Sequence, residues 1–179
     1  MPKKYAAFDI ETAKVLPASA DDLKSHRPLG ISCAALWCTD QDEPELFYSQ
    51  TPDASPAPRM SRQDVSALVT ELEQKVDEGY TIVTHNGVGF DFDILAEESD
   101  QFAPCRRLAL GHVDMMYHFF CGKGFPIALD KAAEALNLDK KSDVEGSKAP
   151  KLWQEGDYER VLEYVAQDCR LTLDVAEKS

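Results

Sequence analysis

The chain has 179 residues, 44% of them hydrophobic, and its 32 acidic and 19 basic residues give a formal net charge of −13. This length and composition suit one domain with its own core, so we expect residues 1–179 to form a single domain. The acidic balance excludes a protein that coats nucleic acid, or a polybasic membrane-surface protein, by charge alone. It leaves open an enzyme that holds phosphate groups through metal ions.

Targeting segments are not expected either. No apolar run approaches the length of about 20 residues that a membrane span needs, and the N-terminal segment becomes acidic at Asp9, unlike a signal peptide. The five cysteines are odd in number and form no CxxC pair. This usage favours reduced, mostly buried thiols and a cytoplasmic protein.

The first half of the chain predicts three strands. The apolar run over residues 5–10 is typical of a buried strand, and residues 13–28 read as a loop. Residues 31–37 and 45–49 predict two further strands, joined by a polar turn. The proline-rich segment 51–59 cannot be a central strand, because proline removes a ladder hydrogen bond.

The second half alternates helices with short strands. A helix is expected over residues 61–78, with Ser61 as its N-cap and Gly79 beyond its end. The remaining elements expected, in chain order, are a strand at 81–84, a helix at 90–99, a strand at 111–116, a small helix at 129–136, a charged loop at 140–150, and a last helix that Asp157 can cap.

This element order predicts a mixed five-stranded sheet flanked by helices. Short turns between the first three strands favour antiparallel pairing, whereas helical connections favour parallel pairing of the later strands. The first strand should lie at the centre of the sheet.

Acidic side chains stand at unusual places in these elements. Alternation along the first strand directs Phe8 and Ile10 to one face and Asp9 and Glu11 to the other. Two carboxylates about 7 Å apart on one strand repel each other unless cations lie between them. A solvated strand end would explain such a pair in isolation, but this strand is otherwise apolar and belongs in the interior of the sheet.

Two further groups follow in the chain. Gly87 and Gly89 form a turn between a strand and a helix, and Asp91 lies in the first turn of that helix, where it can complement the helix dipole. A dinucleotide loop is excluded, because its third glycine would fall at Phe92. Near the C-terminus, Tyr164 and Asp168 are one helical turn apart on the same face.

Taken together, FDIET, NGVGFDFDIL and YVAQD resemble the three motifs of the DEDD superfamily of 3′–5′ exonucleases, in the same order. The chain is similar to the tyrosine-bearing subgroup, which includes the proofreading exonuclease domains of family B DNA polymerases. Glu163 stands where the histidine-bearing subgroup would place its histidine. The segments HVDMMY and LDKAAEAL extend the resemblance. It implies an α/β, ribonuclease H-like fold with a mixed five-stranded sheet flanked by helices.

The resemblance also implies a catalytic site. Asp9, Glu11, Asp91 and Asp168 would hold two divalent ions, Mg²⁺ or Mn²⁺, and Tyr164 would orient the attacking water. Two such ions, roughly 3.5–4 Å apart, can both activate a water and stabilise a leaving oxygen. The implied activity is 3′–5′ exonuclease hydrolysis of phosphodiester bonds at single-stranded 3′ ends, with release of nucleoside monophosphates.

Substrate contacts are expected from Thr12, Asn86 and Phe90, while the roles of Lys123, Lys148 and Lys151, placed in loops, stay open. Because the remaining surface is also acidic, a tight grip on a long nucleic-acid backbone is not expected. We expect a stand-alone enzyme that trims short DNA or RNA ends, with a protein partner as a further option for substrate delivery. Two alternatives are a catalytically retired binding module, and a structure-specific endonuclease or small-nucleotide phosphodiesterase.

Overall fold

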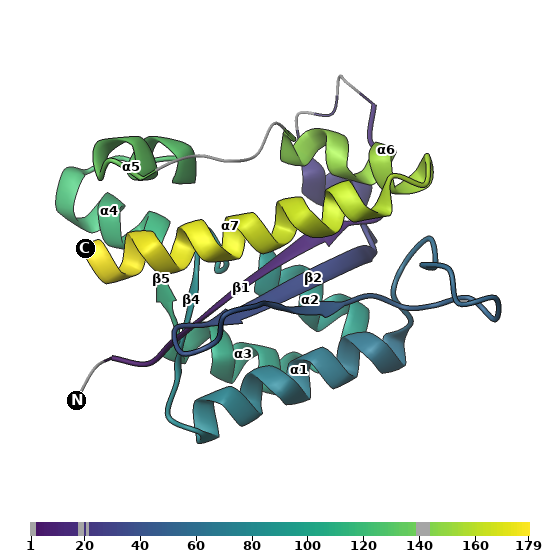
Figure 1. The fold of residues 1–179 in the computed structure, drawn as a ribbon, viewed down its shortest axis with the longest axis horizontal. Helices are drawn as coiled ribbons and strands as arrows, with labels where there is room; N and C mark the ends of the chain where they lie inside the picture. The colour runs from purple at the N-terminus through teal and green to yellow at the C-terminus, as the bar shows by residue number, and fades with distance from the viewer. Residues whose placement is uncertain (1–2, 18–19, 21, 139–143) are drawn as a thin grey trace.

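In a computed structural model that describes residues 3–17, 20, 22–138 and 144–179, the chain forms a mixed five-stranded sheet with helices on both faces (Figure 1). The strand order is β3-β2-β1-β4-β5, so the first strand lies at the centre, as predicted. Within those residues, none of the helices combines the length and the apolar character that crossing a membrane requires.

The strand directions follow the connections. β1 (Tyr5–Thr12) pairs antiparallel with β2 (Ile31–Cys38), and β2 pairs antiparallel with β3 (Glu45–Phe47). β4 (Thr81–Thr84) and β5 (Val113–Asp114) then extend the sheet in parallel with β1. The predicted antiparallel meander followed by parallel strands is therefore confirmed.

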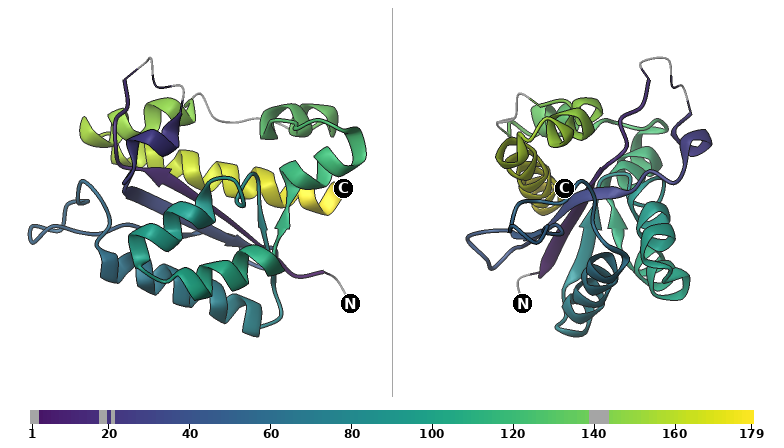
Figure 2. Two further views of the ribbon diagram at one scale, coloured as in Figure 1. Left: turned by 180° about the vertical axis from the view of Figure 1, so that it is seen from behind. Right: turned by 90° about the vertical axis from the view of Figure 1, so that its right-hand side faces the viewer.

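Three helices cover one face of the sheet: α1 (Arg62–Asp77), α2 (Asp91–Ser99) and α3 (Phe102–Gly111) (Figure 2). The start of α1 is fixed as predicted, because the Oγ atom of Ser61 accepts a hydrogen bond from the backbone N–H of Asp64 at 3.1 Å. Such a cap satisfies a donor that the first helical turn would otherwise leave without a partner.

The other face carries the long C-terminal helix α7 (Tyr158–Lys178), which runs along β1 and β2 (Figure 1). α6 (Ala149–Gln154) precedes it, and α4 (Met115–Lys123) and α5 (Leu129–Ala135) pack near its C-terminal part. Asp157 occupies the N-cap position of α7 but makes no capping hydrogen bond through its side chain.

The strand predicted at residues 111–116 is wrong over most of its length. Only Val113 and Asp114 pair with the sheet, while α3 ends just before them and α4 begins at Met115. The physical reason is a cap: the Asp114 carboxylate accepts the backbone N–H groups of Met116 and Tyr117 at 3.0 and 3.3 Å. These bonds turn the chain into a helix where the apolar pattern suggested a longer strand.

Two predicted loops also contain short helices. Residues 23–26 form a 3-10 helix within the predicted loop 13–28, of which residues 18, 19 and 21 lie outside the described part. In the predicted loop 140–150, a 3-10 helix (Gly146–Lys148) leads into α6. Residues 140–143 of that loop lie outside the described part. Pro150 stands in the first turn of α6, where its missing N–H costs nothing. Lys148 and Lys151 therefore lie in helices rather than in loops.

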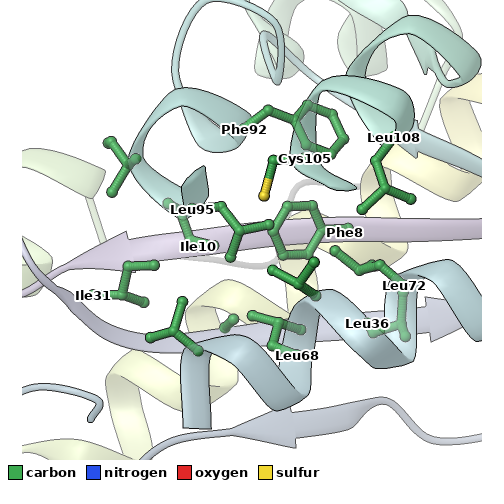
Figure 3. Close-up of a cluster of buried hydrophobic side chains, with 14 of the residues drawn as sticks. Phe8, Ile10, Ile31, Leu36, Leu68, Leu72, Phe92, Leu95, Cys105 and Leu108 are labelled. Atoms are coloured by element: carbon green, nitrogen blue, oxygen red, sulfur yellow. The ribbon is translucent and has the colours of Figure 1, made fainter. Parts of the chain in front are cut away.

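The alternation predicted for β1 determines which side chains form the main core. Phe8 and Ile10 pack beneath α1 and α2 against Leu68, Leu72 and Phe92, and all five are at most 3% exposed (Figure 3). Burial of this apolar face anchors β1 between the helices. The side chains of Asp9 and Glu11, which alternate with those of Phe8 and Ile10 along β1, are thereby directed toward α7.

Small side chains line the sheet beneath α7. Ala7, Cys33 and Ala35 on the strands and Cys169 on the helix are all fully buried in one cluster. The approach is so close that the Cys169 thiol donates a hydrogen bond to the backbone carbonyl of Ala35 at 3.3 Å. Larger side chains at these positions would hold α7, and the residues it carries, farther from β1.

We therefore expect Ala35→Val to destabilise the fold by about 1–3 kcal/mol, because two added carbons overpack the interface between β2 and α7. Urea unfolding measures the change. Ala103→Val, on the exposed surface of α3, is the matched control and should cost less than about 0.7 kcal/mol through helix propensity alone. Equal losses in the two variants would contradict this account of the interface.

Candidate active site

A cavity of about 720 Å³ opens at the C-terminal end of β1, below the start of α7. Acidic side chains and a tyrosine line one part, and apolar side chains line another. The lining residues are Asp9, Ile10, Glu11, Thr12, Lys14, Val15, Leu16, Pro17, Ala20, Leu23, Phe90, Gly146, Ser147, Lys148, Pro150, Lys151, Tyr164 and Asp168. The cavity is therefore amphipathic, with its acidic part on the central strand.

The structure brings the four predicted acids together from three elements. Asp9 and Glu11 stand on β1, Asp91 is the first residue of α2, and Asp168 lies on α7. The backbone N–H of Ile10 donates to Oδ1 of Asp91 at 3.3 Å, and a hydrogen bond joins the carboxyl groups of Asp9 and Asp91. Asp91 is only 3% exposed and reaches the site through Asp9.

Burial, together with neighbouring acids, makes Asp9, Glu11 and Asp91 hold their protons unusually tightly. Burial raises the pKa of Asp9 well above its usual value, and the charges of Asp91, Glu11 and Asp168 raise it further. Burial, followed by the charges of Asp168 and Asp91, likewise raises the pKa of Glu11. Burial raises the pKa of Asp91 to about 7. The cluster therefore lacks compensating positive charge.

Tyr164 lies one helical turn before Asp168 on α7, as its spacing predicts, and its hydroxyl hydrogen-bonds to that carboxyl group. Burial, followed by the charges of Asp168 and Glu11, raises the pKa of Tyr164 above its usual value. The hydroxyl therefore stays protonated and can position a neighbour by hydrogen bonding. Gly146 passes beside it, since a Cβ atom there would lie 3.2 Å from the Tyr164 hydroxyl oxygen; the sequence did not indicate this contact.

The turn that delivers Asp91 depends on its two glycines. A Cβ atom at Gly87 would lie 2.3 Å from Oγ1 of Thr84, and one at Gly89 would lie 2.5 Å from Oδ1 of Asn86. Asn86 itself adopts a left-handed conformation with φ of 74°, which asparagine tolerates better than most residues. The glycines are therefore required for close packing within the turn.

Asp114 is an organising residue to which sequence reasoning gave no role. Its carboxylate is 7% exposed and accepts the backbone N–H groups of Asn86 and Val88 at 3.0 and 3.1 Å. It therefore holds the turn before Asp91 while it also caps α4. In the sequence Asp114 lies within the strand predicted at 111–116, and nothing there connects residue 114 to residues 86 and 88.

The predicted substrate contacts divide into two groups. Thr12 and Phe90 line the cavity, whereas Asn86 is not among the lining residues and serves the turn. Lys148 and Lys151 line the cavity and also pair with Glu145 and Glu155 at 3.1 and 3.7 Å. Lys123 lies elsewhere, at the end of α4. Substrate binding stays a prediction for Thr12, Asn86 and Phe90, and the roles of the three lysines stay open.

The chemistry of the donor set fits hard divalent cations. Within the described ranges, no group of three or more histidine, cysteine, aspartate or glutamate side chains is already arranged around a metal position. The cluster nevertheless offers carboxylate oxygens alone, the ligands that Mg²⁺ and Mn²⁺ prefer. Burial raises the pKa values of Asp9, Glu11 and Asp91, and neighbouring acids raise those of Asp9 and Glu11 further, so bound cations would stabilise the ionised carboxylates.

Comparisons with known proteins agree with the fold. A model of the RNase_H superfamily matches residues 6–179. The chain is similar in structure to the family B DNA polymerase from the hyperthermophilic archaeon Pyrobaculum calidifontis, with a TM-score of 0.67 and 23% identity over 99% of this chain and 24% of that one. It is also similar to an Exonuclease I, with a TM-score of 0.50 and 15% identity over 99% of this chain and 42% of that one.

The chain thus spans less than half the length of either solved structure. The search of curated proteins gave no match. The predicted α/β, ribonuclease H-like fold is confirmed.

The buried acids predict an unusual dependence of stability on pH in metal-free protein. Asp91 releases its proton near pH 7 when folded, but near pH 3.9 when unfolded. Between these values the folded state binds more protons, so the free energy of unfolding should fall as the pH rises from about 4 to about 7. In EDTA, denaturation at several pH values should show this fall, and Asp91→Asn should reduce it.

Asp42→Asn removes an exposed acid between β2 and β3, near the N-terminal end of β1 and away from the cluster at its C-terminal end, and should leave the pH dependence unchanged. A slope that is the same in Asp91→Asn and in the unmodified protein would contradict the assignment of this effect to the acidic cluster.

Proposed function

Because this chain belongs to the RNase_H superfamily, we propose that it is a metal-dependent 3′–5′ exonuclease that releases nucleoside monophosphates from single-stranded nucleic-acid ends. The observation that supports this most directly is the convergence of Asp9, Glu11, Asp168 and Tyr164 on one cavity, with Asp91 bonded to Asp9. The sequence order of these residues matches the three exonuclease motifs.

The four acids would hold two divalent ions. Asp9, at the centre of the cluster, would bridge both ions, Glu11 and Asp168 would complete one site, and Asp91 would belong to the other. When bound, such a pair supplies an activated water and stabilises the leaving oxygen. Ion binding would also replace the protons that the cluster otherwise retains.

The remaining cavity residues would orient the substrate. The protonated Tyr164 hydroxyl, already bonded to Asp168, would position the attacking water rather than remove its proton. Phe90 and the apolar wall formed by Leu16, Pro17 and Leu23 would pack against the terminal nucleoside, and Thr12 would contact its sugar or phosphate. A cavity of about 720 Å³ has the size of an ordinary small-molecule site.

The direct test uses a single-stranded oligonucleotide labelled at either its 5′ or its 3′ end, incubated with Mn²⁺. We expect the 3′ label to leave first as a mononucleotide, while the 5′ label marks a ladder of shortening products. EDTA should stop the reaction, and Asp9→Asn should abolish it. Internal fragments from both substrates would indicate an endonuclease, and the absence of hydrolysis would favour a binding module.

The role of Tyr164 separates this mechanism from simple packing. Tyr164→Phe keeps the ring but removes the hydroxyl, so turnover should fall by roughly 10²–10⁴-fold, the usual contribution of such a group. Mn²⁺ affinity, measured by calorimetry, should remain nearly unchanged.

Asp168→Asn is the matched comparison, because it removes a proposed ligand and should lower both turnover and Mn²⁺ affinity. Full turnover in Tyr164→Phe would exclude the hydroxyl from the reaction and leave Tyr164 with a packing role alone.

A further inference from the structure

One long segment of this acidic chain is nearly free of acids. Residues 101–129 contain three basic residues, Arg106, Arg107 and Lys123, and a single acid, Asp114. That acid is buried and accepts hydrogen bonds from four backbone N–H groups. The segment thus carries a formal net charge of +2 within a chain of −13. Arg106 and Arg107 lie on α3, on the other face of the sheet from α4, and Arg107 pairs with Glu73 at 2.6 Å. Near α4, residues 115–129 contain Lys123 and no acid, so they do not repel a polyanion.

The same segment carries the exposed aromatic side chains. In the described part of the chain, the large aromatic residues that are exposed are Phe102, Tyr117, Phe120 and Phe125, at 61%, 48%, 46% and 58%. Exposed aromatic groups that gather in one region mark a binding surface more often than scattered ones do. Phe102 lies on α3, on the other face of the sheet, so only the other three can form one surface.

Three of these residues lie on α4 and at its end. Tyr117 and Phe120 are three positions apart, so they share one face of the helix. Gly124 closes the helix in a left-handed conformation, its N–H donating to the carbonyl of Phe120 at 2.7 Å, and Phe125 follows directly. We refer to Tyr117, Phe120 and Phe125 as the aromatic platform. The opposite side of α4 packs inward through the buried Met115.

Hydrogen bonds connect the platform to the candidate active site. The Asp114 carboxylate accepts the N–H of Val88 at 3.1 Å through one oxygen and that of Tyr117 at 3.3 Å through the other. Beyond the platform, His85 Nε2 lies 3.0 Å from the carbonyl oxygen of Ile127. The segments that carry the platform therefore hold residues 85–88, the first part of the turn that delivers Phe90 and Asp91 to the site.

We propose that the aromatic platform binds the unpaired bases of a single-stranded nucleic acid whose 3′ end lies in the cavity, an inference that rests on the proposed exonuclease function. Every base has a π-face, so aromatic stacking holds a strand without reading its sequence. Lys123, at the end of α4, adds a contact for the backbone. Residues 115–129, which carry the platform, contain Lys123 and no acid, and this favours a polyanion as the occupant.

The first test measures binding without hydrolysis. A fluorescent oligo(dT) of about 12 nucleotides, within the usual site size of single-strand binders, is titrated in EDTA and followed by anisotropy. In the double variant Tyr117→Leu/Phe120→Leu, the dissociation constant should rise at least about fivefold, because stacking contributes 1–3 kcal/mol per base. Leucine keeps the apolar bulk, so this loss reports on stacking rather than on apolar contact.

Phe102→Leu is the matched control, since it removes an equally exposed aromatic side chain from α3 rather than from the platform. Its affinity should equal that of the unmodified protein. Tyr117→Phe/Phe120→Trp keeps two aromatic faces and should retain binding. If the unmodified protein fails to bind the oligonucleotide, or if the leucine variant binds equally well, the proposal is overturned and the platform is left for a protein partner.

A second measurement separates this proposal from the exonuclease proposal. The nitrophenyl ester of thymidine monophosphate can reach the cavity but not the platform, whereas oligo(dT) can reach both. The leucine variant should raise KM for oligo(dT) with kcat unchanged, and should hydrolyse the ester normally. Equal KM values for oligo(dT) would overturn the platform. If the unmodified protein hydrolyses neither substrate, the exonuclease proposal fails, while the binding comparison still decides whether the platform holds single strands.

Discussion

The central constraint on this molecule is the burial of like-charged carboxyl groups at the middle of its sheet. Asp9 and Glu11 stand on the central strand, and the pKa values of both are raised by burial and by their acidic neighbours. Packing on both sides of β1 opposes this repulsion: Phe8 and Ile10 are locked beneath α1 and α2, and small side chains admit α7 on the other face. The core therefore holds together a site that, without cations, destabilises it.

The site draws on elements that differ in how they are held. β1 and α7 are positioned by extensive apolar burial, which ties Asp9 and Tyr164 to the buried core. Asp91 instead follows an irregular turn, whose shape depends on close glycine contacts and on the N–H groups bound by Asp114. Asp114, which does not line the cavity, thus helps to fix the position of Asp91.

Short-range periodicity explains what the sequence could predict. The alternation in β1 and the four-residue spacing of Tyr164 and Asp168 each lie within a single secondary-structure element, so the sequence alone predicts both. The bonds from Asp114 to residues 86 and 88 depend on the tertiary fold and left no sequence signal. The strand predicted at 111–116 included Met115 and Met116, which are the first residues of α4. Periodicity alone does not separate a strand from a helix in so short an apolar run.

The acidity of the chain limits how it could hold a polyanionic substrate. A net charge of −13 disfavours a grip based on many phosphate contacts, the usual source of affinity for nucleic acids. On the proposals made above, cations held by the acidic cluster would neutralise the scissile phosphate, and the aromatic platform would hold the bases by stacking. Because stacking releases few counterions, affinity would depend weakly on salt. Such an arrangement suits an enzyme that holds a short single-stranded end and releases it readily, since few phosphate contacts would need to break as the strand moves.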